Sequence, residues 1–491
     1  MNRRELLGGL GVASASTLLW ALGCSGTQKP TSVVAEAVAD RDSVRTWLRE
    51  AVSRLRAVFP TVHALAVERL RSTAASDVLG TGLAHARRDG VVLVVRDEAG
   101  LWREQVSSDL TRQGVANAVR ALVGTSRKTV SIDFGPVPPA SEVPRSFTDG
   151  ELRNRVEAIT RKRVDSRVVY GVSLLDIEDT WVFSIAPGRD LEHRARRVRQ
   201  SVIRAAWNGP RPVVGSVERG WVGKLVDPRA LGESDAERAT EFALEMMTPA
   251  PFPDGRHTVL LDPSVTASLV DAGVRALLTT AAARRPEVQR GIAIGGTVAS
   301  PLLTVIDDPT TRGSYGSFTF DDEGELAAPL TLIDKGRLTG VLGDRVGGGR
   351  GRGLRAGHVG AVEPSPSHLR VVAGPTPHGD LRDDGFLIEG ALGAIVDPGT
   401  TRVVIAAARA RVIKGGKPTG HVFPDVELVG DLGLLFGSVT GVSSDSERFD
   451  LRDERDGEPR WRSVEAPWLR IPLGDAKQPG VVRARQQAGL K

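Results

Sequence analysis

Short strand-like segments separated by turn sequences fill the second half of the chain, and this pattern limits the possible folds more than any other feature. Strands are predicted over 258–261, 302–306, 316–320, 329–333, 338–342, 368–372, 385–390, 401–411 and 421–428. The runs Asp322-Glu323-Gly324 and Asp334-Lys335-Gly336 are typical of hairpin turns. One helix, over 264–283, interrupts the series. Many strands with a single helix predict a curved, barrel-like antiparallel sheet.

The first half of the chain mixes helices with strands. Apolar residues at helical spacing predict helices over 43–59 and 110–123, and Thr148 with Glu151 forms a capping box for a third. Strands are expected over 81–95, 167–175, 180–185 and 194–204, of which 167–175 and 180–185 would form a hairpin. The arginines of 194–204 are expected on a solvated strand face. The predicted fold class is therefore α+β, with an N-terminal α+β domain followed by a C-terminal curved, barrel-like antiparallel β domain.

These patterns divide the chain into six segments. They are a signal over 1–24, a tether over 25–37, an N-terminal α+β domain over 38–228, a helical connector over 229–255, a C-terminal β domain over 256–475 and a tail over 476–491. Ser234 and Glu237 predict a capping box for the connector helix, and Pro249 follows its end. Both halves are long enough to form a core of their own.

The composition argues against nucleic-acid binding. The net charge is only +5 over 491 residues, and aromatic residues make up 4%, which leaves few rings on which bases could stack. A glycine-rich run over 347–353 reads GGGRGRG and could contact RNA, but a single short copy is more typical of a mobile loop. No nucleic-acid partner is therefore expected.

The N-terminus resembles an export signal. Arg3 and Arg4 precede a weakly apolar run rich in Gly, Ala and Leu, as in a twin-arginine (Tat) signal. Small residues lead up to Cys24, the only cysteine of the chain, so the segment resembles a lipobox and Cys24 is the expected lipidation site. Ala21 stands where a lipobox usually has leucine, which leaves a plain signal-peptidase site as an alternative. A cytosolic protein with an accidental apolar start is another.

The expected location is therefore the periplasm or cell envelope. The chain would be a Tat-exported lipoprotein that contacts the membrane only through its lipid anchor. One cysteine allows neither an intrachain disulfide nor a cysteine-rich zinc site.

Common catalytic motifs are missing from the sequence. It has no GxxxxGK[ST] loop, no strand-linked GxGxxG, no GxSxG and no zincin pair of histidines. His358, His368 and His378 share one loop-rich stretch, but their spacing of ten fits no compact metal motif. Scattered surface histidines are the preferred interpretation, and a metal cluster is the alternative.

Four runs in the second half resemble the TldD/PmbA family, the "modulator of DNA gyrase" proteins. They read VASPLLTVIDDP at 298–309, GSYGSF at 313–318, FDDEG at 320–324 and LIDKGRL at 332–338. The resemblance implies the same fold as the patterns above, including the β domain over 256–475. It also implies a chemistry, because the metal-bearing relatives are zinc peptidases that act on unfolded or modified peptides. Their HExxxH helix supplies two zinc ligands and a water-polarising glutamate, and a cysteine follows further on.

This chain departs from the HExxxH motif at the positions that bind zinc and polarise water. Aligned on Pro263 and Leu269, the first histidine becomes Asp271, the glutamate becomes Ala272 and the second histidine becomes Ala276. The distal cysteine is absent too. The resemblance is thus to a PmbA/TldE-like member that lacks HExxxH, so no catalytic residue, no metal ligand and no zinc cofactor are expected. Weak coordination of a cation by Asp271 is the alternative.

The resemblance implies a non-catalytic partner subunit in peptide proteolysis or maturation, a pseudoenzyme of the cell envelope. Its expected partner is a TldD-like subunit that carries HExxxH, or a second copy of itself as a dimer. An extended peptide could be held at a sheet edge, where backbone hydrogen bonds require no particular sequence. Two alternatives remain open. One is an envelope peptide-binding or scaffold protein without a protease role. The other is an active metallopeptidase with non-standard ligands from His358, His368 or His378.

Overall fold

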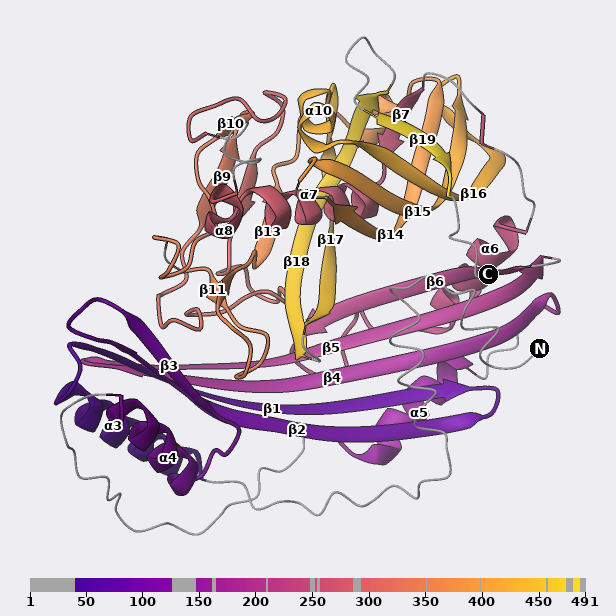
Figure 1. Ribbon diagram of the computed structural model, residues 1–491. Helices are drawn as coiled ribbons and strands as arrows, with labels where there is room; N and C mark the ends of the chain where they lie inside the picture. The colour runs from indigo at the N-terminus through magenta and orange to yellow at the C-terminus, as the bar shows by residue number, and fades with distance from the viewer. Residues whose placement is uncertain are drawn as a thin grey trace, which may run out of the picture.

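The computed structural model in Figure 1 shows two large sheets, one for each half of the chain. It describes residues 40–125, 147–160, 165–208, 211–247, 252–253, 257–285, 293–349, 351–397, 399–455, 458–473 and 480–485. Arg3, Arg4 and Cys24, with the rest of the expected signal and tether, lie outside the described residues. Within the described ranges, no helix combines the length and the apolar character needed to cross a bilayer.

The N-terminal sheet has six long antiparallel strands in the order β3-β2-β1-β4-β5-β6. They are β1 (Thr61–Asp77), β2 (Gly80–Arg96), β3 (Trp102–Ser107), β4 (Val168–Ala186), β5 (Arg189–Asn208) and β6 (Arg211–Val222). Three helices pack beneath this sheet, as Figure 1 shows: α3 (Arg41–Arg56), α4 (Arg112–Val123) and α5 (Asp149–Thr160). The other face supports the C-terminal half.

The three helices of the first half begin within two residues of the predicted positions. The N-cap residues of α3 and α4, Asp40 and Thr111, accept hydrogen bonds from backbone N–H groups of the first turn. At α5, the Thr148 hydroxyl accepts from the Glu151 N–H (3.2 Å) and the Glu151 carboxylate from the Thr148 N–H (2.6 Å). The predicted capping box is therefore confirmed.

The predicted hairpin over 167–185 is wrong, because β4 is one continuous strand. The acidic run in its middle suggests a turn, but the carboxylates are held in place by distant partners. Asp176 accepts two hydrogen bonds from Arg71 (2.8–2.9 Å), and Glu178 accepts one from the indole of Trp461 (2.6 Å). Paired carboxylates can remain buried in a strand, whereas unpaired ones cannot.

The connector helix α6 (Glu233–Glu245) packs on the edge of the sheet against β5 and β6. Gly215 of β6 permits this contact, because a Cβ there would lie 2.0 Å from the carbonyl oxygen of Ala239. The predicted capping box is displaced: Gly232 is the N-cap, and its N–H donates to the carboxylate of Asp235 (2.9 Å).

The C-terminal sheet has eleven strands in the order β10-β9-β8-β13-β18-β7-β14-β15-β16-β19, with β17 paired to β18. They are β7 (Thr258–Leu261), β8 (Val305–Asp307), β9 (Leu330–Asp334), β10 (Arg337–Leu338), β13 (His368–Val371), β14 (Gly385–Val396), β15 (Arg402–Lys414), β16 (Lys417–Asp431), β17 (Gly441–Arg455), β18 (Glu458–Pro472) and β19 (Gly480–Ala484). Short strands β11 (Gly353–Leu354) and β12 (Glu363–Pro364) and the helices α7 (Pro263–Leu277), α8 (Thr280–Ala283), η1 (His378–Leu381) and α10 (Leu432–Gly437) complete the half.

The α+β fold class is confirmed, with differences of detail. The C-terminal sheet is curved but not closed, and it includes two parallel pairs, β7 with β14 and β13 with β18. The strand expected over 316–320 is a loop, and the helix expected over 264–283 is interrupted at Leu278, where α7 ends. The chain leaves the regular ladder at 316–320 because this loop covers the N-terminal sheet.

The run over 347–353 was predicted to be a mobile loop, but its last arginine is buried. Arg352 pairs with the fully buried Asp307 and donates to the backbone oxygen of Ala328 (2.7 Å). This arginine is therefore a structural residue. Two arginines of β5 also depart from the solvated face predicted for them, because Arg197 and Arg204 are buried, whereas Arg194 is exposed as predicted.

Candidate functional site

Helix α7 occupies the position at which the sequence resemblance expects a metal motif. Its N-cap is Asp262, whose carboxylate accepts from the N–H groups of Val265 (2.8 Å) and Gly390 (2.9 Å) and so ties the helix to β14. The helix packs inside the curved sheet, against β14, β15 and β18. Gly273 allows close packing, because a Cβ there would lie 3.0 Å from a methyl carbon of Leu432. The segment is therefore at the centre of the C-terminal half.

Asp271, the buried residue at the first-histidine position, is paired with two arginines. Its carboxylate accepts from Arg462 Nε (2.8 Å) and Nη2 (3.3 Å) on one side and from Arg275 Nε (2.9 Å) on the other. Arg462 also donates to the carboxylate of Asp453 (2.7 Å). Burial alone would raise the pKa of Asp271, but Arg462 and Arg275 outweigh it and hold the pKa below its usual value. The Asp271 carboxylate is thus neutralised by arginine side chains, mainly that of Arg462 on β18.

The other two motif positions carry only methyl groups. Ala272 is buried, and Ala276 packs against the apolar core of the C-terminal half. Neither can bind a metal or take a proton from water. Among the described residues, no three His, Cys, Asp or Glu side chains are grouped so that they could hold a metal ion. The residues present at α7 therefore do not fit zinc.

The structure gives the three candidate histidines separate surroundings. His358 Nε2 lies 2.8 Å from the hydroxyl of Ser108, and His368 Nδ1 lies 3.0 Å from that of Ser314. His378 Nδ1 lies 2.8 Å from a carboxylate oxygen of Asp445. His358 and His368 are buried, so the interpretation of all three as surface residues is wrong.

The run FDDEG forms a loop rich in buried acid groups, whose burial the sequence did not predict. The carboxylate of Asp321 accepts from the N–H groups of Glu323 (3.0 Å), Glu325 (2.9 Å) and Gly353 (3.0 Å). Burial nevertheless raises the pKa of Asp321 to about 6 and that of Glu323 to about 7. The clustered acids were visible in the sequence, but their burial depends on the loop lying against the N-terminal sheet.

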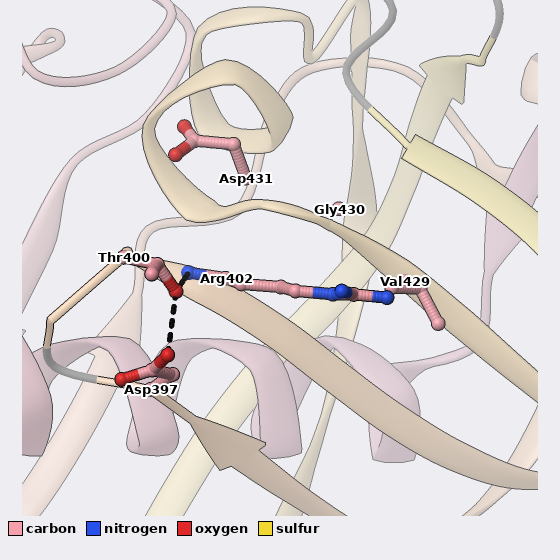
Figure 2. A pocket seen from close by; sticks show the side chains of 6 residues that line it. All are labelled: Asp397, Thr400, Arg402, Val429, Gly430 and Asp431. Atoms are coloured by element: carbon pink, nitrogen blue, oxygen red, sulfur yellow. Dashed lines mark hydrogen bonds between the residues drawn. The ribbon is translucent and has the colours of Figure 1, made fainter.

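A shallow surface pocket lies where β14 turns into β15, beside the end of β16 (Figure 2). It is lined by Asp397, Thr400, Arg402, Val429, Gly430 and Asp431. The Thr400 hydroxyl donates to Asp397 (2.7 Å), and Asp431 caps α10 by accepting from the Leu434 N–H (2.9 Å). Both carboxylates therefore stabilise local turns, which is a structural role.

Comparison with known proteins decides the family. The profile of the PmbA/TldA metallopeptidase C-terminal domain matches residues 254–473. The second half of the chain belongs to the PmbA/TldD family. The matched range includes α7 and every strand from β7 to β18.

Relatives of known sequence extend the likeness beyond this PmbA/TldD domain. A metalloprotease of Methanothermobacter thermautotrophicus is 29% identical over 332 residues, which cover 62% of this chain and 68% of the relative. A metalloprotease TldD homolog of Haemophilus influenzae is 29% identical over 167 residues, 32% of this chain and 34% of its own length.

Solved structures show that the PmbA/TldD fold extends over both halves. A modulator of DNA gyrase from Bacteroides thetaiotaomicron superposes with a TM-score of 0.69 at 16% identity, covering 90% of this chain and 99% of that one. TldE from Thermococcus kodakarensis gives a TM-score of 0.66 at 16% identity, covering 89% and 100%. At this identity the likeness shows a shared fold.

Proposed function

We propose that this chain is a non-catalytic, PmbA-like subunit in peptide proteolysis or maturation, working beside a TldD-like subunit that carries HExxxH. The pairing of Arg462 with Asp271 supports this proposal most. Asp271 is the one carboxylate at the motif positions that could bind a metal, and it already pairs with a guanidinium. Ala272 and Ala276 add no ligand or base. A chain built in this way binds or presents peptide and leaves the hydrolysis to its partner.

The fold offers edges at which an extended peptide could bind. The outer strands of the N-terminal sheet are β3 and β6, and among the described residues no further strand of that sheet pairs with them, although α6 packs against β6. Edge pairing holds a peptide through its main chain, so one surface can accept many sequences. This suits a subunit that presents varied substrates.

Affinity purification of the tagged full-length chain from its native host, followed by mass spectrometry, tests the partnership. We expect a stoichiometric partner with an intact HExxxH, and zinc that follows the partner. The chain alone should hold less than about 0.1 zinc per molecule, because its motif positions offer one carboxylate that is already paired. Recovery of a monomer without such a partner would favour the scaffold alternative. Stoichiometric zinc with chelator-sensitive peptidase activity in the chain alone would refute the proposal.

We propose further that the chain is exported through the Tat route and anchored by lipid at Cys24. The support is the order of Arg3-Arg4, a weakly apolar run and Cys24 in the sequence. Palmitate labelling should mark the wild type and not Cys24→Ala, while Arg3→Lys with Arg4→Lys should leave the unprocessed precursor in the cytosol. Equal labelling of wild type and Cys24→Ala would contradict the anchor, and unchanged fractionation of the double-lysine variant would contradict the route.

A further inference from the structure

A cavity lies between the two halves of the molecule. Its floor comes from β1, β4 and β5 of the N-terminal sheet, and its roof from the loop over 316–322, Leu354, Arg355 and the start of β18. Figure 1 shows β17 and β18 descending onto the N-terminal sheet at this place. The cavity is separate from α7 and from the surface pocket of Figure 2.

Arg197, in the floor of this cavity, is a buried cation without a carboxylate partner. Its side chain donates from Nε to the backbone oxygen of Tyr315 (2.7 Å) and from Nη1, weakly, to the hydroxyl of Thr180 (3.4 Å). Its guanidinium forms no ion pair with a carboxylate of the described residues. Burial lowers its pKa, and the charges of Glu178 and Asp322, which also line the cavity, offset part of that effect. The other lining arginines are paired with carboxylates outside the cavity: Arg69 with Glu458, Arg355 with Glu104 and Arg460 with Glu363. Burying a guanidinium in this way is costly unless an anion joins it.

The remaining walls are apolar or offer hydrogen bonds. Phe318, Phe320 and Trp461 line the cavity together with Asp322, whose carboxylate accepts from the Arg355 N–H (2.7 Å). Glu178 also lines it, but its carboxylate already accepts from the indole of Trp461 (2.6 Å) and from a threonine hydroxyl (3.0 Å). The cavity thus combines one guanidinium without an ion-pair partner, two carboxylates and three aromatic rings.

The same cavity has a further unused polar atom. His193 Nε2 is buried and has no hydrogen-bond partner among the described residues. Burial, with the charge of Arg197, lowers the pKa of His193 to about 4, so the ring is neutral at pH 7 and can donate from one nitrogen. In the tautomer that carries its proton on Nε2, His193 would donate a hydrogen bond beside the Arg197 guanidinium, an arrangement that suits an anion.

We propose that this cavity binds the C-terminal residue of a peptide. Its carboxylate would pair with Arg197, its backbone N–H would donate to Asp322, and an apolar side chain would pack on Phe318, Phe320 and Trp461. An acidic side chain within a peptide could supply the carboxylate, but a terminal residue supplies all three features from adjacent atoms. This proposal rests on the proposed function in one respect, namely that the ligand is a peptide.

Fluorescence anisotropy of the purified full chain with fluorescein-labelled Gly-Ala-Ala-Phe tests the site. The free acid should bind about tenfold or more tightly than the C-terminal amide, because a charge-assisted pair is lost in the amide. Arg197→Gln should remove this preference. Arg196→Gln is the matched control, because Arg196 is adjacent on β5 and pairs with Asp179 on the opposite face, so the preference should persist.

Equal binding of acid and amide by the wild type would overturn the proposal, and so would Arg197→Gln retaining the preference. The proposal would also be overturned if the protein bound an amidated Gly-Ala-Glu-Ala peptide but not the free acid of Gly-Ala-Ala-Phe. In that case the cavity would bind an acidic side chain. If Arg197→Gln fails to fold, Phe318→Ala replaces it, with a loss of about tenfold expected for the free acid. The assay uses the chain alone, so failure to find a protease partner would not affect its outcome.

Discussion

Replacing Arg462 with alanine should lower the free energy of unfolding by about 3–5 kcal/mol. Arg462 and Asp271 are both about nine-tenths buried or more, and removing the guanidinium would leave the Asp271 carboxylate with only the partly exposed Arg275. A buried charge that loses its main partner costs far more than the pair itself contributes. Urea unfolding of the full chain, followed through the shift in midpoint at constant slope, measures the change.

Arg470→Ala is the matched control for this experiment. Arg470 lies on the same strand, β18, but pairs at the surface with the exposed Asp383, so its loss should cost less than about 1 kcal/mol. The double variant Asp271→Leu with Arg462→Met should regain most of the stability, because no buried charge remains and the partly exposed Arg275 and Asp453 lie 3.8 Å apart. A cost for Arg462→Ala no greater than for Arg470→Ala would show that the pair does not organise the α7 region.

Asp307→Ala should be about equally destabilising, by about 3–5 kcal/mol. The Asp307 carboxylate is fully buried, pairs with Arg352 and accepts from the N–H (2.8 Å) and hydroxyl (3.0 Å) of Ser367. The substitution would leave the Arg352 guanidinium buried and without its counter-charge. Because Arg352 lies at the end of the glycine-rich run, limited proteolysis should then cut 347–353 before the rest of the domain unfolds.

The neighbouring Asp308→Ala provides the comparison. Asp308 is half-buried, and its carboxylate accepts from the N–H (2.9 Å) and hydroxyl (2.5 Å) of Thr310 in a local turn. Its loss should cost about 1 kcal/mol, which is typical of hydrogen bonds near solvent. A similar effect for the two aspartates, or unchanged cleavage in Asp307→Ala, would contradict a structural role for the buried pair.

Sequence patterns that act over a few neighbouring residues predicted several helices and strands correctly. Periodicity and capping residues located α3, α4 and α5, and alternation with turn signals located β7, β9, β13, β15 and β16. The failures came where a distant contact overrides the local signal. Asp176 and Glu178 place acids in the middle of the continuous strand β4, where they need partners from β1 and β18. The segment 316–320 leaves the ladder to cover the other half.

That Ala272 and Ala276 provide neither a metal ligand nor a base follows from their identity, because the chemistry of a methyl group does not depend on its surroundings. The amino-acid sequence was therefore enough for this conclusion. It also determined the strand-rich character of the second half, because alternation and turn residues act over a few positions. What Asp271 binds becomes visible in the three-dimensional fold, since Arg462 is 191 residues away along the chain. The burial of Arg197 beside a cavity also becomes visible only there. The stability and pKa of a charged side chain depend on its partner and its solvent exposure. Both are set only when distant segments pack together.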